Sequence, residues 1–361
     1  MKKAKIALCL VLPILMLFSL WGCAQQPAQA PENSQTQATS GQAETPAGAS
    51  EKIRVALVLP GSLNDGGWNA NAYAGLMSLQ GKGYEVAFTE NVAISAIEEA
   101  LNNYASKGYD LIVGHGFEFG EPTLRVAPQY PEVHFFVSGK VPDGVDVNAL
   151  PANVGFMDMK EYEAAYLAGI VAGGMTKSNV IGYIAGLEIP SQLSNMAGFV
   201  KGVASINPNA KVYGVVTGSF EDPAKGQEAA NAQIDMGADI ICHSADSTGM
   251  GAIQAAAEKG VYIVGYGSDQ NDIQPDLVLT SFITKNSEVI EMQVARIEQG
   301  TFGGLWTPGI ADGICYIAPY HGLEGVIPAN VKAAVEDATA KIISGELVVP
   351  AIYERIDEKI G

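Results

Sequence analysis

Short apolar runs alternate with amphipathic stretches from about residue 51 onward, and no other feature constrains the fold of this chain as strongly. The runs have the length of strands, whereas the stretches between them repeat apolar residues at helical spacing. Repeated strand–helix–strand units with apolar strands are typical of parallel sheets that helices cover on both faces. The sequence therefore predicts an α/β protein.

The alternation falls into two similar blocks, over roughly 53–153 and 154–281, which predicts two lobes. A chain of 361 residues has the length of two domains at roughly 150 residues each. The expected strands are Ile53–Leu59, Tyr84–Phe88, Asp110–Val113, Val133–Val137, Val180–Ile184, Val212–Val216, Ile240–Cys242 and Tyr262–Val264. The expected helices are Trp68–Leu79, Ala93–Lys107, Glu121–Tyr130, Tyr162–Met175, Gln192–Ile206, Ala224–Met236, Gly249–Lys259, Ser287–Gln299 and Asn330–Ser344.

The residues that follow the first strand are candidates for ligand binding, because a two-lobed α/β protein has its cleft at the carboxyl ends of its strands. Asn64 and Asp65 can hydrogen-bond a ligand or cap the next helix. Trp68 opens that helix, and Asn69 follows it directly. The Trp68 ring can stack on a flat ligand or anchor the core, and the spacing leaves both alternatives open.

Two acidic residues follow the third strand. Glu118 and Glu121 can accept hydrogen bonds from a ligand, but the helix macrodipole also favours surface acids in the first turn of a helix. For Glu118 the surface position is the preferred interpretation, and for Glu121 both alternatives stay open.

The second block has its own strand-end residues. Phe220 lies in a loop ahead of a predicted helix cap, and Asp246 and Asp269 each follow a strand. Two aromatic rings, strand-end carboxylates and small polar residues suit a flat ligand that bears hydroxyl groups. Purine nucleosides fit this description, and so do sugars.

Sequence motifs for catalysis are missing. GxSxG, HExxH and GxxxxGK[ST] do not occur, and His243, Ser244 and Asp246 are too close along the chain to form a hydrolase triad. No CxxC or His/Cys cluster indicates a metal site, so we expect neither a metal nor another cofactor. We expect Cys242 and Cys315 to be buried free thiols, with a disulfide as the alternative.

The first 22 residues have the pattern of a secretory signal. A basic start precedes an apolar run of about 15 residues, whereas a membrane span needs about 20. The segment Leu20-Trp21-Gly22-Cys23 resembles the bacterial lipobox, which predicts that Cys23 is the lipidated N-terminus. Residues 24–50 lack large apolar side chains, so we expect residues 23–50 to be the lipidated cysteine and a disordered tether.

The charge of the chain argues against nucleic acid as a partner. The formal net charge is −18, and loss of the predicted signal removes three lysines, which makes it −21. A surface this acidic repels phosphate groups, and the sequence contains no Arg/Lys stripe to attract them.

Three motifs together resemble the basic membrane protein family of ABC-transporter substrate-binding lipoproteins, whose type members are purine-nucleoside receptors. The motifs are Asn64-Asp65-x-x-Trp68-Asn69 with Tyr73-x-Gly75-Leu76, then Tyr166-Leu167-Ala168-Gly169-x-x-Ala172-Gly173, and then Gly218-Ser219-Phe220-x-Asp222-Pro223-x-Lys225-Gly226. The resemblance covers nearly all of residues 53–350. It implies a periplasmic-binding-protein type I fold, with two lobes, three crossover strands and a ligand cleft at the hinge. The implied lobes are 51–153 plus about 282–316, and 154–281 plus about 317–361.

The resemblance also implies roles for individual residues. Trp68 and Phe220 match the two rings that hold a purine between them, and Asn64 and Asp65 lie in the first binding loop of the family. Glu121 stands where the family commonly has an aspartate.

Two further positions match residues near the ribose. Asp269 matches the acid that binds ribose hydroxyls. The Ser-x-x-Lys pattern of the family is one residue longer here, as Ser281-x-x-x-Lys285, so Thr284 is an alternative to Lys285. Stretches such as Glu163-Ala164-Ala165-Tyr166 also resemble a branch that binds a free nucleobase such as adenine, which leaves the ribose contacts open.

We therefore expect a non-enzymatic receptor that is lipid-anchored outside the cytoplasm. It would close on a purine nucleoside or nucleobase and deliver it to ABC permease subunits. The alternatives are a receptor for a sugar or another small polar ligand on the same fold, and a nucleoside-hydrolysing enzyme. The candidate ligand-binding residues are Asn64, Asp65, Trp68, Asn69, Glu121, Phe220, Asp246, Asp269 and Lys285.

Overall fold

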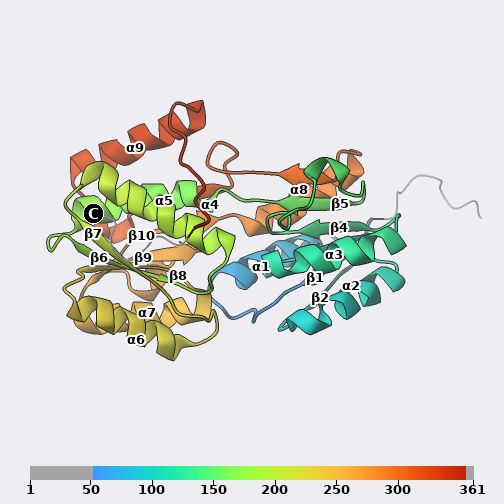
Figure 1. Cartoon of the computed structure of the whole chain (residues 1–361), viewed down its shortest axis with the longest axis horizontal. Helices are drawn as coiled ribbons and strands as arrows, with labels where there is room; N and C mark the ends of the chain where they lie inside the picture. Colours follow the sequence, from blue (N-terminus) through green and yellow to red (C-terminus); the bar gives the residue numbers. More distant parts are fainter. Residues whose placement is uncertain (1–51, 355–361) are drawn as a thin grey trace, which may run out of the picture. The chain divides into compact units, whose positions relative to one another are not determined.

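The computed structural model describes residues 52–354, and this part of the chain contains two six-stranded sheets covered by helices (Figure 1). The α/β prediction is thus confirmed. The predicted signal, Cys23 and the tether lie outside the described residues. Within residues 52–354, no helix combines the length and the apolar character that a membrane span requires.

The first sheet is parallel throughout. Its strands lie in the order β11 (Gly304–Trp306), β5 (Val154–Met157), β4 (His134–Val137), β3 (Leu111–Gly114), β1 (Val55–Val58) and β2 (Val86–Thr89). The central strands β1 and β3 are buried along their whole length, because helices cover both faces of the sheet. This double burial explains why both strands are continuous apolar runs in the sequence.

The second sheet repeats this design with one antiparallel edge. Its order is β12 (Cys315–Ile317), β10 (Val278–Thr284), β9 (Tyr262–Gly267), β8 (Ile240–Ser244), β6 (Val180–Ala185) and β7 (Lys211–Val216), and only β12 runs antiparallel to its neighbour. Cys242 and Cys315 are buried free cysteines in β8 and β12. The expectation of buried thiols in strands is therefore confirmed.

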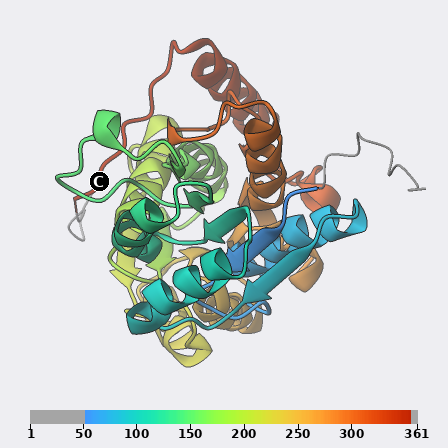
Figure 2. The same ribbon diagram turned by 90° about the vertical axis from the view of Figure 1, so that its right-hand side faces the viewer.

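Helices cover both faces of each sheet. On the first sheet, α1 (Trp68–Gly81) and α8 (Asn286–Glu298) lie on one face, and α2 (Ile97–Ser106) and α3 (Gly120–Val126) lie on the other (Figures 1 and 2). We call this sheet with these four helices the first lobe. The second lobe is the other sheet with α4 (Glu161–Met175), α5 (Pro190–Ile206) and α9 (Ala329–Ser344) on one face, and α6 (Pro223–Asp235) and α7 (Asp246–Lys259) on the other.

The chain passes between the lobes three times, after β5, after β10 and after β11. β5 lies in the first sheet although it begins at residue 154, where the sequence predicts the second lobe to start. β12 ends at residue 317 and lies in the second sheet, although the expected range of the first lobe extends to about residue 316. The three-residue strands β11 and β12 are too short to give a periodic signal in the sequence.

Glycines allow the helices of each lobe to pack closely. On α4 and α5, Gly169, Gly198 and Gly202 lie so near the facing backbone that a Cβ atom at any of them would overlap a carbonyl oxygen of the partner helix. Gly226 and Gly251 have the same role between α6 and α7. These contacts fix the distance between the helices that cover the second sheet.

We predict that Gly202→Ala destabilises the protein by about 1–3 kcal/mol, because the new methyl group would overlap the Tyr166 carbonyl oxygen and force α4 and α5 apart. The matched control is Gly81→Ala at the end of α1, where a Cβ atom meets nothing within 4 Å. We expect this control to leave stability unchanged or to raise it by about 0.5–1 kcal/mol. Urea unfolding of both variants measures the difference, and equal effects would contradict the packing argument.

Candidate ligand-binding site

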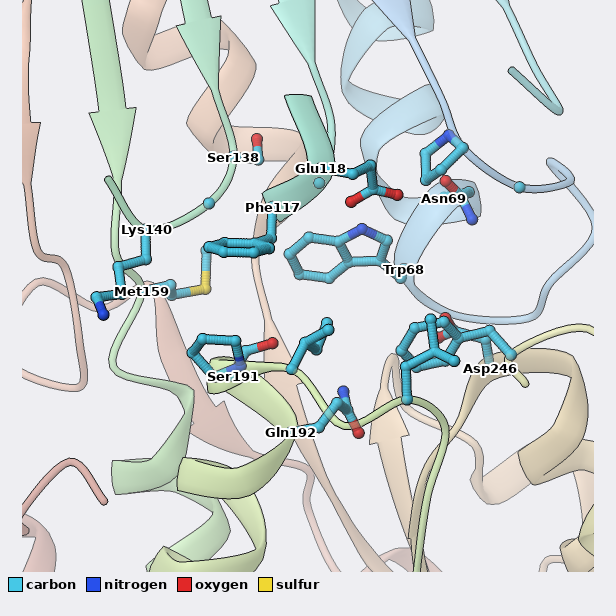
Figure 3. Close-up of a pocket in the computed structure, with 18 of the residues that line it drawn as sticks. Trp68, Asn69, Phe117, Glu118, Ser138, Lys140, Met159, Ser191, Gln192 and Asp246 are labelled. Carbon is cyan, nitrogen blue, oxygen red and sulfur yellow. The ribbon is translucent and has the colours of Figure 1, made fainter. Parts of the chain in front are cut away.

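A pocket of about 400 Å³ is lined by both lobes, a volume within the usual range of small-molecule sites (Figure 3). Nearly all of its lining lies at or just past the carboxyl ends of parallel strands, as the sequence pattern predicts. The first lobe contributes Pro60, Gly61, Trp68, Asn69, Val92, Ala93, Ile94, Gly116, Phe117, Glu118, Ser138, Gly139, Lys140, Met157, Asp158 and Met159. The second lobe contributes Glu161, Leu187, Ile189, Pro190, Ser191, Gln192, Gly218, Ser219, Phe220, Glu221, Asp246 and Tyr266.

The two predicted aromatic residues line this pocket from opposite lobes, and each ring packs against a neighbouring group of its own lobe. The Trp68 ring stacks on His115, with 4.3 Å between ring centroids and 19° between the planes. The Phe220 ring lies so close to the backbone at Gly186 that a Cβ atom there would overlap it. Each ring is thus held by packing and also forms part of the pocket wall.

The imidazole behind Trp68 is uncharged at neutral pH. His115 is 1% exposed, and this burial lowers its pKa to about 3. Its Nε2 atom lies 3.2 Å from the Trp68 carbonyl oxygen, which helps to hold the ring in place. The indole therefore rests on a neutral aromatic ring.

Asp65 organises the start of α1 instead of facing the ligand space. Its carboxylate accepts hydrogen bonds from the backbone N–H groups of Gly67, Asn69 and Ala70 and from the Asn69 side chain. Negative charge is favourable at this end of a helix, so the cap is strong. The result is that Trp68 and Asn69 are held at the pocket by a rigid turn.

Five carboxyl groups line the pocket, and each has a raised pKa. Burial is the first cause for all of them, namely Glu118, Asp158, Glu161, Glu221 and Asp246. The pKa of Glu161 rises to about 7, even though Asn195 and the Tyr266 hydroxyl donate hydrogen bonds to its Oε2 atom. The Asp246 pKa is raised by burial first, and repulsion from Asp65 and Glu221 adds to the effect.

Lys140 is the one lysine or arginine among the residues that line this pocket in the described chain. Its ammonium group is 2.8 Å from Asp143 Oδ1 and lies over the ring of Tyr353. Its charge is therefore shared with a carboxylate of its own loop. The pocket as a whole favours neutral or cationic ligands over anionic ones.

Of the candidate residues, the structure brings Trp68, Asn69, Phe220 and Asp246 together at the pocket. The others do not line it. Asn64 is exposed, and Asp65 is committed to the helix cap described above. Asp269 is bonded to His321 through its Oδ2 atom at 2.7 Å.

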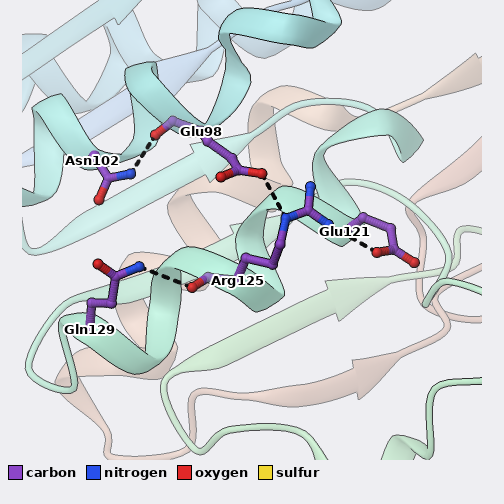
Figure 4. Close-up of polar contacts among 5 residues, drawn as sticks. All are labelled: Glu98, Asn102, Glu121, Arg125 and Gln129. Carbon is purple, nitrogen blue, oxygen red and sulfur yellow. Dashed lines mark hydrogen bonds and ion pairs between the residues drawn. The ribbon is translucent and has the colours of Figure 1, made fainter.

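Glu121 and Lys285 form ion pairs on the surface instead. Glu121 pairs with Arg125. Arg125 also pairs with Glu98 and thereby joins α3 to α2 (Figure 4). Lys285 pairs with Glu288 in the first turn of α8, and its alternative Thr284 does not line the pocket either.

Sequence analysis preferred a surface position for Glu118, but this residue lines the pocket, and several other lining residues were missed. A short 3-10 turn, Phe117–Phe119, places Phe117 and Glu118 at the pocket, and α3 then begins one residue before Glu121. The Glu118 carboxyl folds back over Gly116, where any side chain would meet it. The signal that could have found this turn is the pair of glycines around His115, which frees the backbone to bend.

Asp158 and Glu161 were also missed. They follow β5, which the sequence pattern did not predict as a strand of the first lobe. Within residues 52–354, no group of three or more His, Cys, Asp or Glu side chains has the arrangement of a metal site.

Comparison with known proteins agrees with this geometry. Residues 52–353 match the family model described as ABC transporter substrate-binding protein PnrA-like. A purine-binding protein of Brucella abortus is 32% identical over 305 residues, which is 83% of each chain.

Solved structures share the fold. An ABC transporter solute-binding protein from Conexibacter woesei superimposes with a TM-score of 0.69 at 30% identity, over 83% of this chain and 99% of that chain. A glucose-galactose binding protein from Geobacillus stearothermophilus has a TM-score of 0.55 at 14% identity, over 76% and 99% of the two chains, which shows the fold alone. The two-sheet architecture is thus the periplasmic-binding-protein type I fold.

We predict that Glu161 makes the free energy of unfolding fall as pH rises from about 4.5 to about 7. The unfolded chain releases this proton near the ordinary pKa of 4.5, whereas the folded protein keeps it until about pH 7. The folded state binds more protons in this window, so each pH unit costs up to about 1.4 kcal/mol of stability.

Urea unfolding of the ligand-free protein at pH 5, 6, 7 and 8 measures this slope. Glu161→Gln keeps an acceptor for Asn195 and Tyr266 but cannot ionise, so we expect its slope to be flatter than that of the wild type. The other buried carboxyls are common to both proteins and cancel in the difference. Identical slopes for the two proteins would contradict the prediction.

Proposed function

Since this chain belongs to the PnrA-like family of ABC transporter substrate-binding proteins, we propose that it captures a purine nucleoside or nucleobase and delivers it to a membrane permease. The observation that supports the proposal is that two aromatic rings, Trp68 and Phe220, line one pocket from opposite lobes, each held by packing within its own lobe. Flat heterocycles gain from stacking on such rings. The purine-binding relative from Brucella abortus supports the same class of ligand.

The contacts between the lobes support capture by closure. Asn71 at the start of α1 donates hydrogen bonds from its Nδ2 atom to the carbonyl oxygens of Gly267 and Thr284, at 3.1 and 2.7 Å. Ser268 donates to the Gly66 carbonyl oxygen at 2.9 Å. These bonds join the lobes next to the pocket, so a ligand that contacts both lobes would shift the balance between open and closed forms.

Delivery to a permease requires the protein to be held at the outer face of the membrane. We propose that Cys23 carries the lipid that provides this anchor, and that residues 24–50 form the tether. The high negative charge then belongs to a domain that works outside the cytoplasm on a neutral ligand.

We predict that Trp68→Ala weakens purine binding by roughly 10- to 100-fold, whereas Trp68→Phe retains most of the affinity because a ring remains to stack. The matched control is Trp306→Ala, since Trp306 lies beside Arg296 and does not line the pocket. Isothermal titration calorimetry with adenosine, guanosine, inosine and their bases measures the affinities. Full purine affinity in Trp68→Ala would refute the sandwich, and binding of sugars without any purine would favour the sugar receptor.

We predict that Cys23→Ser releases the protein from the membrane fraction of its bacterial host, because the lipid-bearing thiol is lost. Fractionation followed by immunoblotting measures the distribution of wild type and variant. Cys242→Ser is the control, because this buried thiol in β8 cannot carry a lipid. Retention of the Cys23→Ser variant on membranes would show that another segment provides the anchor.

A further inference from the structure

Two buried oxygen atoms in the wall of the pocket have no hydrogen-bond partner in the protein. They are Oδ1 of Asn69 and Oδ1 of Asp246, in side chains that are 3% and 6% exposed. The orientation of the Asn69 amide is fixed, because its Nδ2 atom donates to Asp65 Oδ2 at 2.8 Å and a carboxylate can only accept. Asn69 Oδ1 is therefore an acceptor, and Asp246 Oδ1 is an acceptor when the carboxyl group is ionised.

The backbone at Asp246 indicates that this acid has a function. Its φ angle is +45°, in the left-handed region where glycine is unstrained and where aspartate carries some strain. The residue is the first of α7 and buries its carboxyl group at the same time. A strained, buried acid at a pocket wall is costly for folding, and such features persist where binding requires them.

The surroundings of Asp246 leave its charge without compensation from the protein. Asp65, Glu221 and Glu161 all repel it, and burial raises its pKa well above the ordinary value. The nearby backbone N–H of Trp68 lowers the pKa and only partly offsets this repulsion. No arginine lines the pocket within the described chain, and Lys140 is already paired with Asp143. A ligand that donates hydrogen bonds to this group would stabilise its ionised form.

We propose that Asp246 and Asn69 select a purine that carries an exocyclic amino group over one that carries a carbonyl oxygen at the same ring position. This inference rests on the proposed function and names the specificity-determining residues of the same site. An amino group on a purine donates N–H bonds and accepts almost none, so it satisfies the free acceptor oxygens of the wall. A carbonyl oxygen in that place would face another oxygen across the contact and leave both without a donor.

The test uses ligands of nearly equal shape that differ in donor and acceptor groups. Adenine and 2-aminopurine carry an amino group, hypoxanthine carries a carbonyl at the position of the adenine amine, and 6-methylpurine carries neither. Calorimetric titration of the wild-type full-length protein, with these bases and their ribosides, gives the order of affinity. We expect at least one aminopurine to bind roughly tenfold or more tightly than both hypoxanthine and 6-methylpurine.

Substitution of Asp246 separates its role in selection from a role in folding. In Asp246→Asn, an amide nitrogen replaces one carboxyl oxygen, so the wall gains a donor that can bind a carbonyl oxygen. We expect this variant to reverse the preference and to bind hypoxanthine more tightly than adenine.

In Asp246→Gly, the free acceptor and the backbone strain are both removed. This variant should bind all four bases within about threefold of one another, with a melting temperature equal to or above that of the wild type.

The matched control is Asn179→Gly, which changes another residue with positive φ (+59°) just before β6 and away from the pocket. It should keep the wild-type order of ligands. The inference is overturned if the wild type binds hypoxanthine or 6-methylpurine as tightly as both aminopurines, or if Asp246→Asn keeps the wild-type order. If the wild type binds no purine at all, the proposed function fails first and this inference fails with it.

Discussion

Parallel sheets that helices cover on both faces bury their central strands, and this constraint determines where the side chains that can meet a ligand lie. Strands β1, β3, β8 and β10 are buried along their whole length, so polar side chains within them, such as His243 and Ser281, bond other groups of the protein. The segments past the carboxyl ends of β1, β3, β5, β7 and β8 carry the rings and carboxyls that line the pocket. Glycine contacts set the distance between the helices that cover the second sheet.

The pocket combines two opposing physical demands. Its aromatic rings favour a flat apolar surface, whereas its crowded carboxyls need donors that only a polar edge can supply. A heterocycle with apolar faces and a rim of N–H groups meets both demands at once. An anionic ligand such as a nucleotide would place phosphates among acids whose pKa values are already raised by burial.

The class of fold and the position of nearly every helix could be predicted from the sequence, because apolar periodicity reports burial directly. The rings Trp68 and Phe220 could also be found, since each follows a strand in a loop that favours bending. The direction in which each side chain points could not be predicted. Glu118 and Glu121 are three residues apart, yet a 3-10 turn brings the first to the pocket while α3 carries the second to the surface beside Arg125.

Partners that lie far apart in the sequence explain the remaining misses. Asp269 was assigned to the ligand, but His321 lies far along the chain and binds it. Asp158 and Glu161 became pocket residues only because the chain leaves the first sheet at β5, a few residues later than its periodicity indicates. Local patterns contain no information about such long-range pairings.

The stacking of Trp68 on His115 has a consequence for how this molecule can be observed. The imidazole stays neutral until about pH 3, so the indole keeps the same uncharged neighbour throughout the range in which the folded protein is handled. Residues 52–354 contain one other tryptophan, Trp306, which lies outside the pocket. One of the two indoles of this part of the chain therefore lines the pocket, so ligand binding can be followed through tryptophan fluorescence without any added label.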